Sequence, residues 1–348
     1  MLRNVLLYSA LSVITFAPAA TAFGANGSPD GSGMFAGGGM FGKKEMVMVV
    51  NGGPLRETKN FALGSFRVAF VTSDEVTSVK RGGWTSGGAT AEMSGTLIGL
   101  EHPEMQKIAD AVYADFLAKA AAQGLTIMDS VKLAAASPTY KAMAMTPNFE
   151  EGRLGTIVVP TGQMSVILAE DQSKKTTKGS KGLFAAYSQL GAINFATADA
   201  NKMFPGIAKE TGATVIGVTI VVNFADFKAS SRNWGGASTK VLTGATVDGN
   251  GTELLRETSI MGWGPKTQPC PACMAEILFT SSIHSEERIG EIGSSKTRHS
   301  SFSVGGDTLS SSASKSMYVT IDLPAYEKNV LVVSSEASSL MLAELGTK

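Results

Sequence analysis

The residues best suited to chemistry are Cys270 and Cys273, the only two cysteines of the 348-residue chain. A Cys-x-x-Cys pair can be redox-active when its first sulfur lies at the start of a helix, whose dipole lowers the pKa of the thiol. Here the preceding segment, Gly262–Pro269, is polar and contains proline, which is not the buried strand that precedes a thioredoxin-type motif. We predict a local Cys270–Cys273 disulfide that stiffens a loop in an oxidising compartment. Redox activity and half of a metal site are the alternatives.

Other residue types that could do chemistry are few and scattered. The three histidines, His102, His284 and His299, have no partners spaced like a zinc site, which needs four close ligands. Asp110 and Asp115 lie five residues apart on an expected helix, so they do not form a paired-carboxylate site. The sequence has no Gly-x-Ser-x-Gly elbow and no phosphate-binding loop. We therefore predict no catalytic, cofactor-binding or metal-binding residue.

The charge balance argues against two classes of partner. Lys and Arg number 30 and Asp and Glu number 30, with a pI near 6.9, so the chain lacks the basic face that binds nucleic acid or an anionic membrane. Charged residues make up only 17% of the chain and glycine contributes 39 residues, which gives a surface made polar by uncharged side chains. This composition favours an extracytoplasmic protein that does not bind nucleic acid.

The N-terminal segment predicts export. Arg3 precedes an apolar run, Val5–Phe16, and small residues at Ala20 and Ala22 match a signal peptidase site. We expect a signal peptide over residues 1–22. No cysteine lies near the expected cleavage point, so a lipid anchor is not predicted, and the expected location is the periplasm or the outer membrane.

Residues 23–44 are expected to form a flexible tether. They contain eight glycines and almost no charge, so they cannot bury enough apolar surface to offset the loss of backbone entropy. Two Met-Phe pairs interrupt the tether, and both side chains pack well in adaptable contacts. The candidate partner contacts are Met34, Phe35, Met40 and Phe41.

Residues 45–258 have the pattern of an α/β domain. Strand-length apolar runs at 66–71 and 125–128 flank a helix that begins near Pro103, whose apolar residues recur at spacings of three and four. A second helix over 198–211 leads into the continuous apolar strand 213–227, which suits the middle of a sheet. Gly124 and Gly212 are placed to end the two helices. The Gly/Ser/Thr-rich segment 81–95 is expected to be a loop, and 240–247 with 252–256 a hairpin.

Residues 259–348 predict a β-rich extension that ends in a helix. The serine-rich segment 294–316 suits a loop or an exposed hairpin, and Asp322 can cap a final helix whose apolar stripe would dock on the sheet. The expected fold class is therefore α/β (α+β), a mixed β-sheet with packed helices, a β-rich extension and a C-terminal helix.

Two stretches resemble a known family. One runs from Ile108 through a helix to Asp129-Ser130, and the other ends a helix as Ala208-x-x-x-Gly212-Ala213 before a strand. Over about residues 60–258 the chain resembles the bacterial envelope superfamily of the curli secretion channel, the peptidoglycan-synthase activator lipoproteins and the N-terminal domain of the Tol-Pal propeller protein. The resemblance implies a role in the cell envelope.

We therefore expect a non-enzymatic, exported protein that acts as an assembly or adaptor component by binding envelope proteins or further copies of itself. A first alternative is an oligomeric outer-membrane secretion channel of the curli-exporter type, which needs two amphipathic hairpins per chain, expected within residues 162–195 and 296–321. An envelope hydrolase or redox enzyme is a further alternative.

Overall fold

The computed structural model describes residues 46–80, 88–142, 149–151, 155–163, 198–232, 236–247, 258–268, 273–279, 282–285, 287–294, 298–304 and 307–347. The chain divides into two compact units, Met1–Lys44 and Glu45–Lys348, and every described residue belongs to the second. The expected signal peptide and the tether, with Met34, Phe35, Met40 and Phe41, lie outside the described residues.

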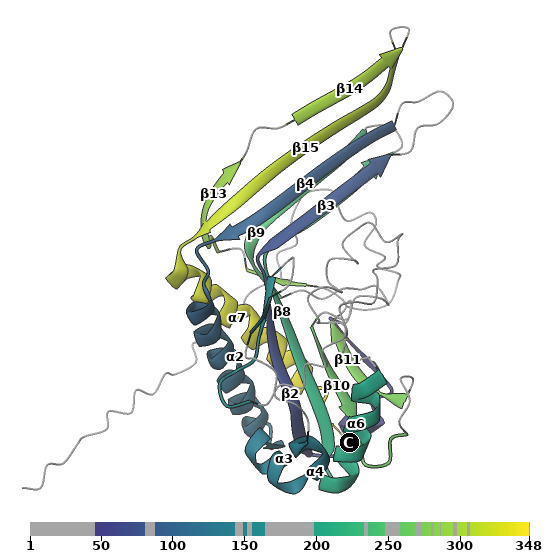
Figure 1. Cartoon of the computed structure of the whole chain (residues 1–348), viewed down its shortest axis with the longest axis vertical. Helices are drawn as coiled ribbons and strands as arrows, with labels where there is room; N and C mark the ends of the chain where they lie inside the picture. The colour runs from purple at the N-terminus through teal and green to yellow at the C-terminus, as the bar shows by residue number, and fades with distance from the viewer. Residues whose placement is uncertain are drawn as a thin grey trace, which may run out of the picture. The chain divides into compact units, whose positions relative to one another are not determined.

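A first sheet of ten strands forms the centre of the Glu45–Lys348 unit, as Figure 1 shows. Its main path runs β1 (Val47–Val50), β11 (Ala275–Phe279), β10 (Ser259–Trp263), β8 (Thr214–Arg232), β2 (Asn60–Val71), β7 (Gly155–Val158) and β6 (Phe149–Glu151). Three further strands join it: β5 (Thr126–Met128) pairs with β2, β9 (Gly236–Val247) with β8, and β12 (Ile283–His284) with β9. The central strands β2 and β8 are parallel, and the sheet is therefore mixed.

Helices cover both faces of this sheet. Figure 1 shows α2 (His102–Ala122) and α7 (Leu323–Leu342) along one face, where Phe66 and Phe116 belong to one apolar cluster. The other face carries a second cluster, built on α3 (Ser130–Ala136), α4 (Pro138–Lys141) and α6 (Ala198–Thr211). The short α1 (Gly53–Arg56) follows β1. No described helix is both long and apolar enough to span a membrane.

A second sheet has five strands and four of them are long. They are β3 (Ser73–Lys80), β4 (Gly88–Ile98), β15 (Asp307–Ile321), β13 (Gly290–Ser294) and β14 (Arg298–Val304). Strand β2 passes into β3 through Thr72 alone, whose carbonyl accepts a hydrogen bond from Leu97 N (2.8 Å). The predicted mixed α/β fold with a C-terminal helix is confirmed. The β-rich extension expected over residues 259–348 is divided between the sheets, because β10, β11 and β12 belong to the first sheet, whereas β13, β14 and β15 join β3 and β4 in the second.

The helix ends follow the expected chemistry. Gly124 and Gly212 have φ of +72° and +67°, the left-handed region that suits glycine after a helix. Asp322 caps α7, since its Oδ1 accepts a hydrogen bond from Ala325 N (3.4 Å), and Pro324 lies in the first turn. Both α2 and α6 begin and end close to the predicted residues.

The prediction of a loop over residues 81–95 is wrong in part, because β4 begins at Gly88. The small and hydroxyl-bearing residues of β4 have a low strand propensity. The strand forms because it pairs with β3 on one side and with β15 on the other. The first half of the hairpin expected at 240–256 is also paired differently: β9 lies antiparallel to β8. Its expected second strand, 252–256, lies outside the described residues.

Candidate functional site

Two hairpins combine into one continuous sheet, which we call the two-hairpin sheet. One hairpin pairs β3 with β4, from Ser73 opposite Thr96 to Lys80 opposite Ala89. The other pairs β14 with β15, and lies in the serine-rich segment where the sequence allowed a hairpin. Strands β4 and β15 lie parallel over eleven residue pairs, from Gly88 beside Ser310 to Ile98 beside Thr320. This pairing joins segments that are more than 200 residues apart in the chain.

One face of the two-hairpin sheet is anchored in the core. Toward the ends of β4 and β15, the buried residues Gly95, Leu97, Met317 and Val319 occupy every second position, because side chains alternate between the two faces of a strand. Leu97, Met317 and Val319 are 7%, 8% and 0% exposed and belong to the same apolar cluster as α2 and α7. This face therefore fixes the root of the hairpins to the rest of the molecule.

The opposite face presents hydroxyl groups and two apolar side chains to solvent. Thr96, Ser316 and Thr320 are exposed, and Ile98 and Tyr318 are exposed by 46% and 44%. Ser94 Oγ donates a hydrogen bond across the β4–β15 pairing to Ser316 Oγ (3.0 Å). Glu92 and Glu291, which lies opposite Thr320, are also exposed on this face. Hydroxyl groups beside exposed apolar side chains suit contact with another protein surface.

Among the described strands, β3 pairs only with β4, and it also lies close to β8 and β9. On the side of β15 away from β4, β13 and β14 pair with β15 one after the other, and neither pairs with a further described strand. Edge strands of this kind carry main-chain N–H and C=O groups that can pair with a strand of another chain. The geometry therefore supplies two places for strand addition.

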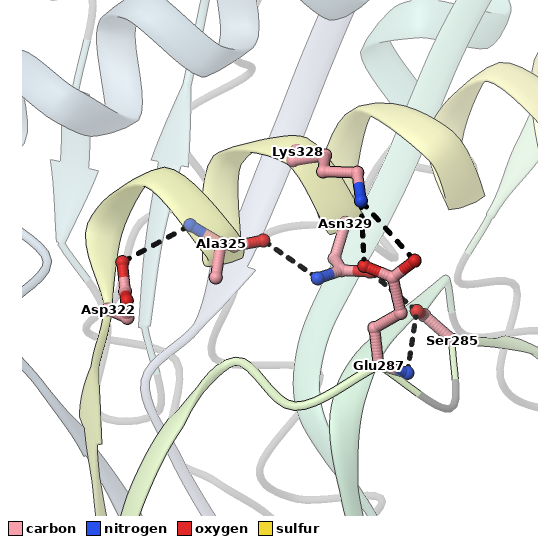
Figure 2. A network of polar contacts seen from close by, with 6 residues as sticks. All are labelled: Ser285, Glu287, Asp322, Ala325, Lys328 and Asn329. Carbon is pink, nitrogen blue, oxygen red and sulfur yellow. Dashed lines mark hydrogen bonds and ion pairs between the residues drawn. The ribbon is translucent and has the colours of Figure 1, made fainter.

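A hydrogen-bond network fixes the junction between the two-hairpin sheet and α7. Figure 2 shows that the buried Asn329 lies at its centre. Its Nδ2 donates to Ala325 O (2.8 Å), and Ser285 Oγ donates to its Oδ1 (2.7 Å). Lys328 forms an exposed ion pair with Glu287 beside it (3.0 Å). The network connects α7, which directly follows β15, to the segment after β12.

The same segment lies beside an irregularity in the β8–β9 pairing, between Asn223 and Ala225. Thr246 is fully buried, and its Oγ1 lies 2.7 Å from His284 Nδ1. Gly244 has a φ of +157°, and a side chain there would overlap the carbonyl oxygen of Ser285. The half-buried His284 therefore contributes to a structural joint.

Within the described part of the chain, no group of three or more histidine, cysteine or acidic residues is placed to hold a metal ion. His102 pairs with Glu151 at 3.0 Å. Asp110 instead binds a loop, since it accepts hydrogen bonds from Thr161 N (2.7 Å) and Thr161 Oγ1 (2.8 Å).

The loop that follows β7 is held to α2 by a buried tyrosine. Gln163 Nε2 donates to Tyr113 Oη (2.6 Å), and the Tyr113 ring packs edge-on against Phe66. Burial, with a smaller contribution from the nearby Asp129 carboxylate, raises the pKa of Tyr113 to about 12. Tyr113 is therefore a neutral structural group at physiological pH.

Cys273 borders a cavity of about 540 Å³ at the end of the first sheet where β2 and β8 begin. The cavity lies between the residues that follow α1 and the turn Gly264–Gln268 that follows β10. Cys273 is not a free thiol. Its expected partner Cys270 lies outside the described residues, so the Cys270–Cys273 pairing stays a prediction.

A row of buried hydroxyls, which was not predicted from the sequence, lies on the face of the first sheet away from α2. Ser65, Thr219 and Ser259 are at most 1% exposed, and their Oγ atoms have no hydrogen-bond partner among the described residues. Thr219 lies directly opposite Ser259 and beside Arg67, which is also buried. The sequence shows these residues as isolated hydroxyls within apolar strands. It does not show that they are buried side by side.

No protein-family model, curated protein or solved structure matches this chain. The function must therefore be argued from the sheets, their edges and the cavity.

Proposed function

We propose that the protein is a non-enzymatic assembly or adaptor component of the bacterial cell envelope, which binds envelope proteins or further copies of itself by strand addition. The observation that carries this proposal is the two-hairpin sheet, whose outer strands β3 and β14 pair on one side only among the described strands. Strand addition supplies affinity through main-chain hydrogen bonds. It needs no catalytic residue and no cofactor.

The exposed face supports the same proposal. The exposed Ile98 and Tyr318 supply apolar area beside the hydroxyls of Thr96 and Ser316. Tyrosine is enriched where proteins meet because it combines a large apolar ring with a hydroxyl. Export by the signal peptide over residues 1–22 and a contribution from the tether, through Met34, Phe35, Met40 and Phe41, belong to this proposal.

The test uses proline on the outer strand β3. Neighbouring residues of an edge strand in an antiparallel pair point their N–H groups alternately toward the partner strand and outward. We therefore substitute proline at two neighbouring positions, Thr77→Pro and Ser78→Pro. One of the two variants loses an outward N–H and keeps all hydrogen bonds between β3 and β4. Thr77→Ser and Ser78→Thr are the matched controls.

The measurement is binding of the full-length protein to itself and to proteins isolated with it from its native envelope, with folding checked by circular dichroism. Loss of association in a folded proline variant, with association kept in both controls, supports the proposal. Unchanged association in the folded proline variant and in an equivalent variant of β14, Ser301→Pro, overturns it.

A second candidate is the oligomeric outer-membrane secretion channel. One observation favours it: two long hairpins lie side by side, and one of them, β14–β15, falls within the expected segment 296–321. The other is β3–β4, whereas the expected segment 162–195 lies outside the described residues after Gln163. Fractionation of cells followed by size-exclusion chromatography separates the candidates, because a channel is recovered as a detergent-soluble oligomer from the membrane and a monomer in the soluble fraction excludes it.

A further inference from the structure

We propose that the cavity of about 540 Å³ beside Cys273 binds a short peptide with free ends, and that Lys266 pairs with the carboxylate of that peptide. The cavity volume falls within the range of small-molecule sites, roughly 300–1,000 Å³. It belongs to the first sheet, so this inference is independent of strand addition at the two-hairpin sheet.

The charges that line the cavity indicate a zwitterionic ligand. Among the described residues of the lining, the charged ones are Lys266 and Glu57, and both are exposed. Their charges cancel, so the site lacks the excess of cations that binds a nucleotide or another polyanion. Lys266 Nζ has no ion-pair or hydrogen-bond partner among the described residues, which leaves the ammonium available for a carboxylate.

The uncharged part of the lining suits a peptide main chain. Thr267 and Gln268 contribute a hydroxyl and an amide group, which can bind both N–H and C=O groups, while the Thr58 hydroxyl already accepts a hydrogen bond from Asn60 N (3.0 Å). None of the described residues of the lining is aromatic, so they offer no platform on which a nucleobase or a planar cofactor could stack.

The walls of the cavity are held in place without the ligand. Thr214 Oγ1 donates to Pro54 O (3.0 Å), which ties the start of β8 to α1. Across the cavity, Gly264 N donates to Thr267 Oγ1 (2.9 Å), and Thr267 N donates to Gly264 O (2.9 Å). These bonds close the turn that carries Lys266, so the ammonium is presented from a structured turn. A preformed site loses less entropy when it binds its ligand.

The test is isothermal titration calorimetry of the full-length protein with trialanine that has free ends. We expect saturable 1:1 binding that weakens with added salt, and at least tenfold weaker binding of the N-acetylated, C-amidated peptide. Lys266→Ala should weaken trialanine binding about tenfold, and Lys266→Arg should restore most of it. Lys315→Ala, which removes an exposed lysine of β15, is the matched control and should bind like the original protein.

Lys266 lies exposed in a turn, so its substitution should leave the melting temperature unchanged, and this is measured alongside. The proposal is wrong if trialanine does not bind, if the blocked peptide binds equally well, or if Lys266→Ala binds as tightly as Lys315→Ala. None of these results bears on strand addition, which the β3 and β14 variants test separately.

Discussion

The first sheet and the two-hairpin sheet differ in how their strands are buried. On β2 the side chain of Phe66 packs under α2, while Ala62, on the opposite face, belongs to the cluster with α4 and α6. On β4 only Leu97 and its same-face neighbours are buried, and Thr96 and Ile98 are exposed. The first sheet is therefore specified by packing on both faces, whereas the two-hairpin sheet depends on main-chain pairing and one apolar face.

The largest expected effect comes from removing an aromatic ring between the first sheet and α2. Phe66 is fully buried and meets Tyr113 and Phe116 edge-on, with ring centroids 5.1 Å and 5.3 Å away. Phe66→Ala should lower the free energy of unfolding by about 3–5 kcal/mol, because it leaves a cavity in the core. Tyr318→Ala on the exposed face of the two-hairpin sheet should cost about 1 kcal/mol or less. Urea unfolding measures both, and equal losses would break the comparison.

The next largest difference in stability is expected between alanine substitutions at two glycines, one in each sheet. A methyl group at Gly155 on β7 would overlap the carbonyl oxygen of Phe70, and a backbone atom cannot move aside without disturbing the β2–β7 ladder. Gly155→Ala should cost about 2–3 kcal/mol. At Gly293 on β13 the methyl group would meet only the exposed ring of Tyr318, which can rotate away. Gly293→Ala should cost less than about 1 kcal/mol in the same urea assay, and a larger loss than at Gly155 would contradict this explanation.

The network in Figure 2 tests the junction that supports the two-hairpin sheet. Asn329→Ala removes the acceptor of Ser285 Oγ within a buried site and should cost about 1–2 kcal/mol. Lys328→Ala removes only the exposed ion pair with Glu287 and should cost less than about 1 kcal/mol. Thermal unfolding compares the two variants. If Lys328→Ala lowers the melting temperature more than Asn329→Ala, the buried amide of Asn329 is not the main stabilising group of the network.

The smallest expected effect is pH-dependent and lies in the helices of the first sheet. The Glu210 carboxylate accepts hydrogen bonds from the hydroxyls of Ser137 and Thr139 and from Thr139 N (3.2 Å), and these bonds lower its pKa in the folded state. A carboxyl with a lowered pKa adds stability at pH values above its ordinary range and loses it as the pH falls through the folded-state pKa.

Glu210→Gln should therefore lower the melting temperature slightly at neutral pH, and the difference from the original protein should shrink in acid. Melting curves between pH 7 and roughly pH 3 measure this change. A difference that grows as the pH falls would show that the sign is wrong.

The sequence predicts the first sheet well because its signals are local. The apolar spacing of α2, the glycines after α2 and α6, and the continuous apolar strand after Gly212 each depend on neighbouring residues, and all have the expected positions. Asp322 likewise predicts the start of α7 from its side chain alone.

The two-hairpin sheet is harder to predict because its pairing is distant. Strand β4 lacks the β-branched, apolar residues typical of a strand, and the partners that stabilise it, β3 and β15, include one that begins more than 200 residues later. The spacing of apolar residues in a short stretch of sequence cannot reveal such distant pairing.

The cavity beside Cys273 cannot be predicted from neighbouring residues either, because Thr58, Thr214 and Lys266 come from three separate segments.

The parallel pairing of β4 with β15 also sets an order of events during folding. The β3–β4 hairpin can form as soon as residues 73–98 are available, but its β4 side stays unpaired until residues 307–321 arrive, close to the end of the chain. Non-local pairing of this kind forms slowly, and unpaired strand edges promote association with the wrong chain meanwhile. During synthesis the protein therefore passes through a period in which its own hairpin exposes an unpaired strand edge, and a chaperone that covers β4 should raise the yield of folded protein.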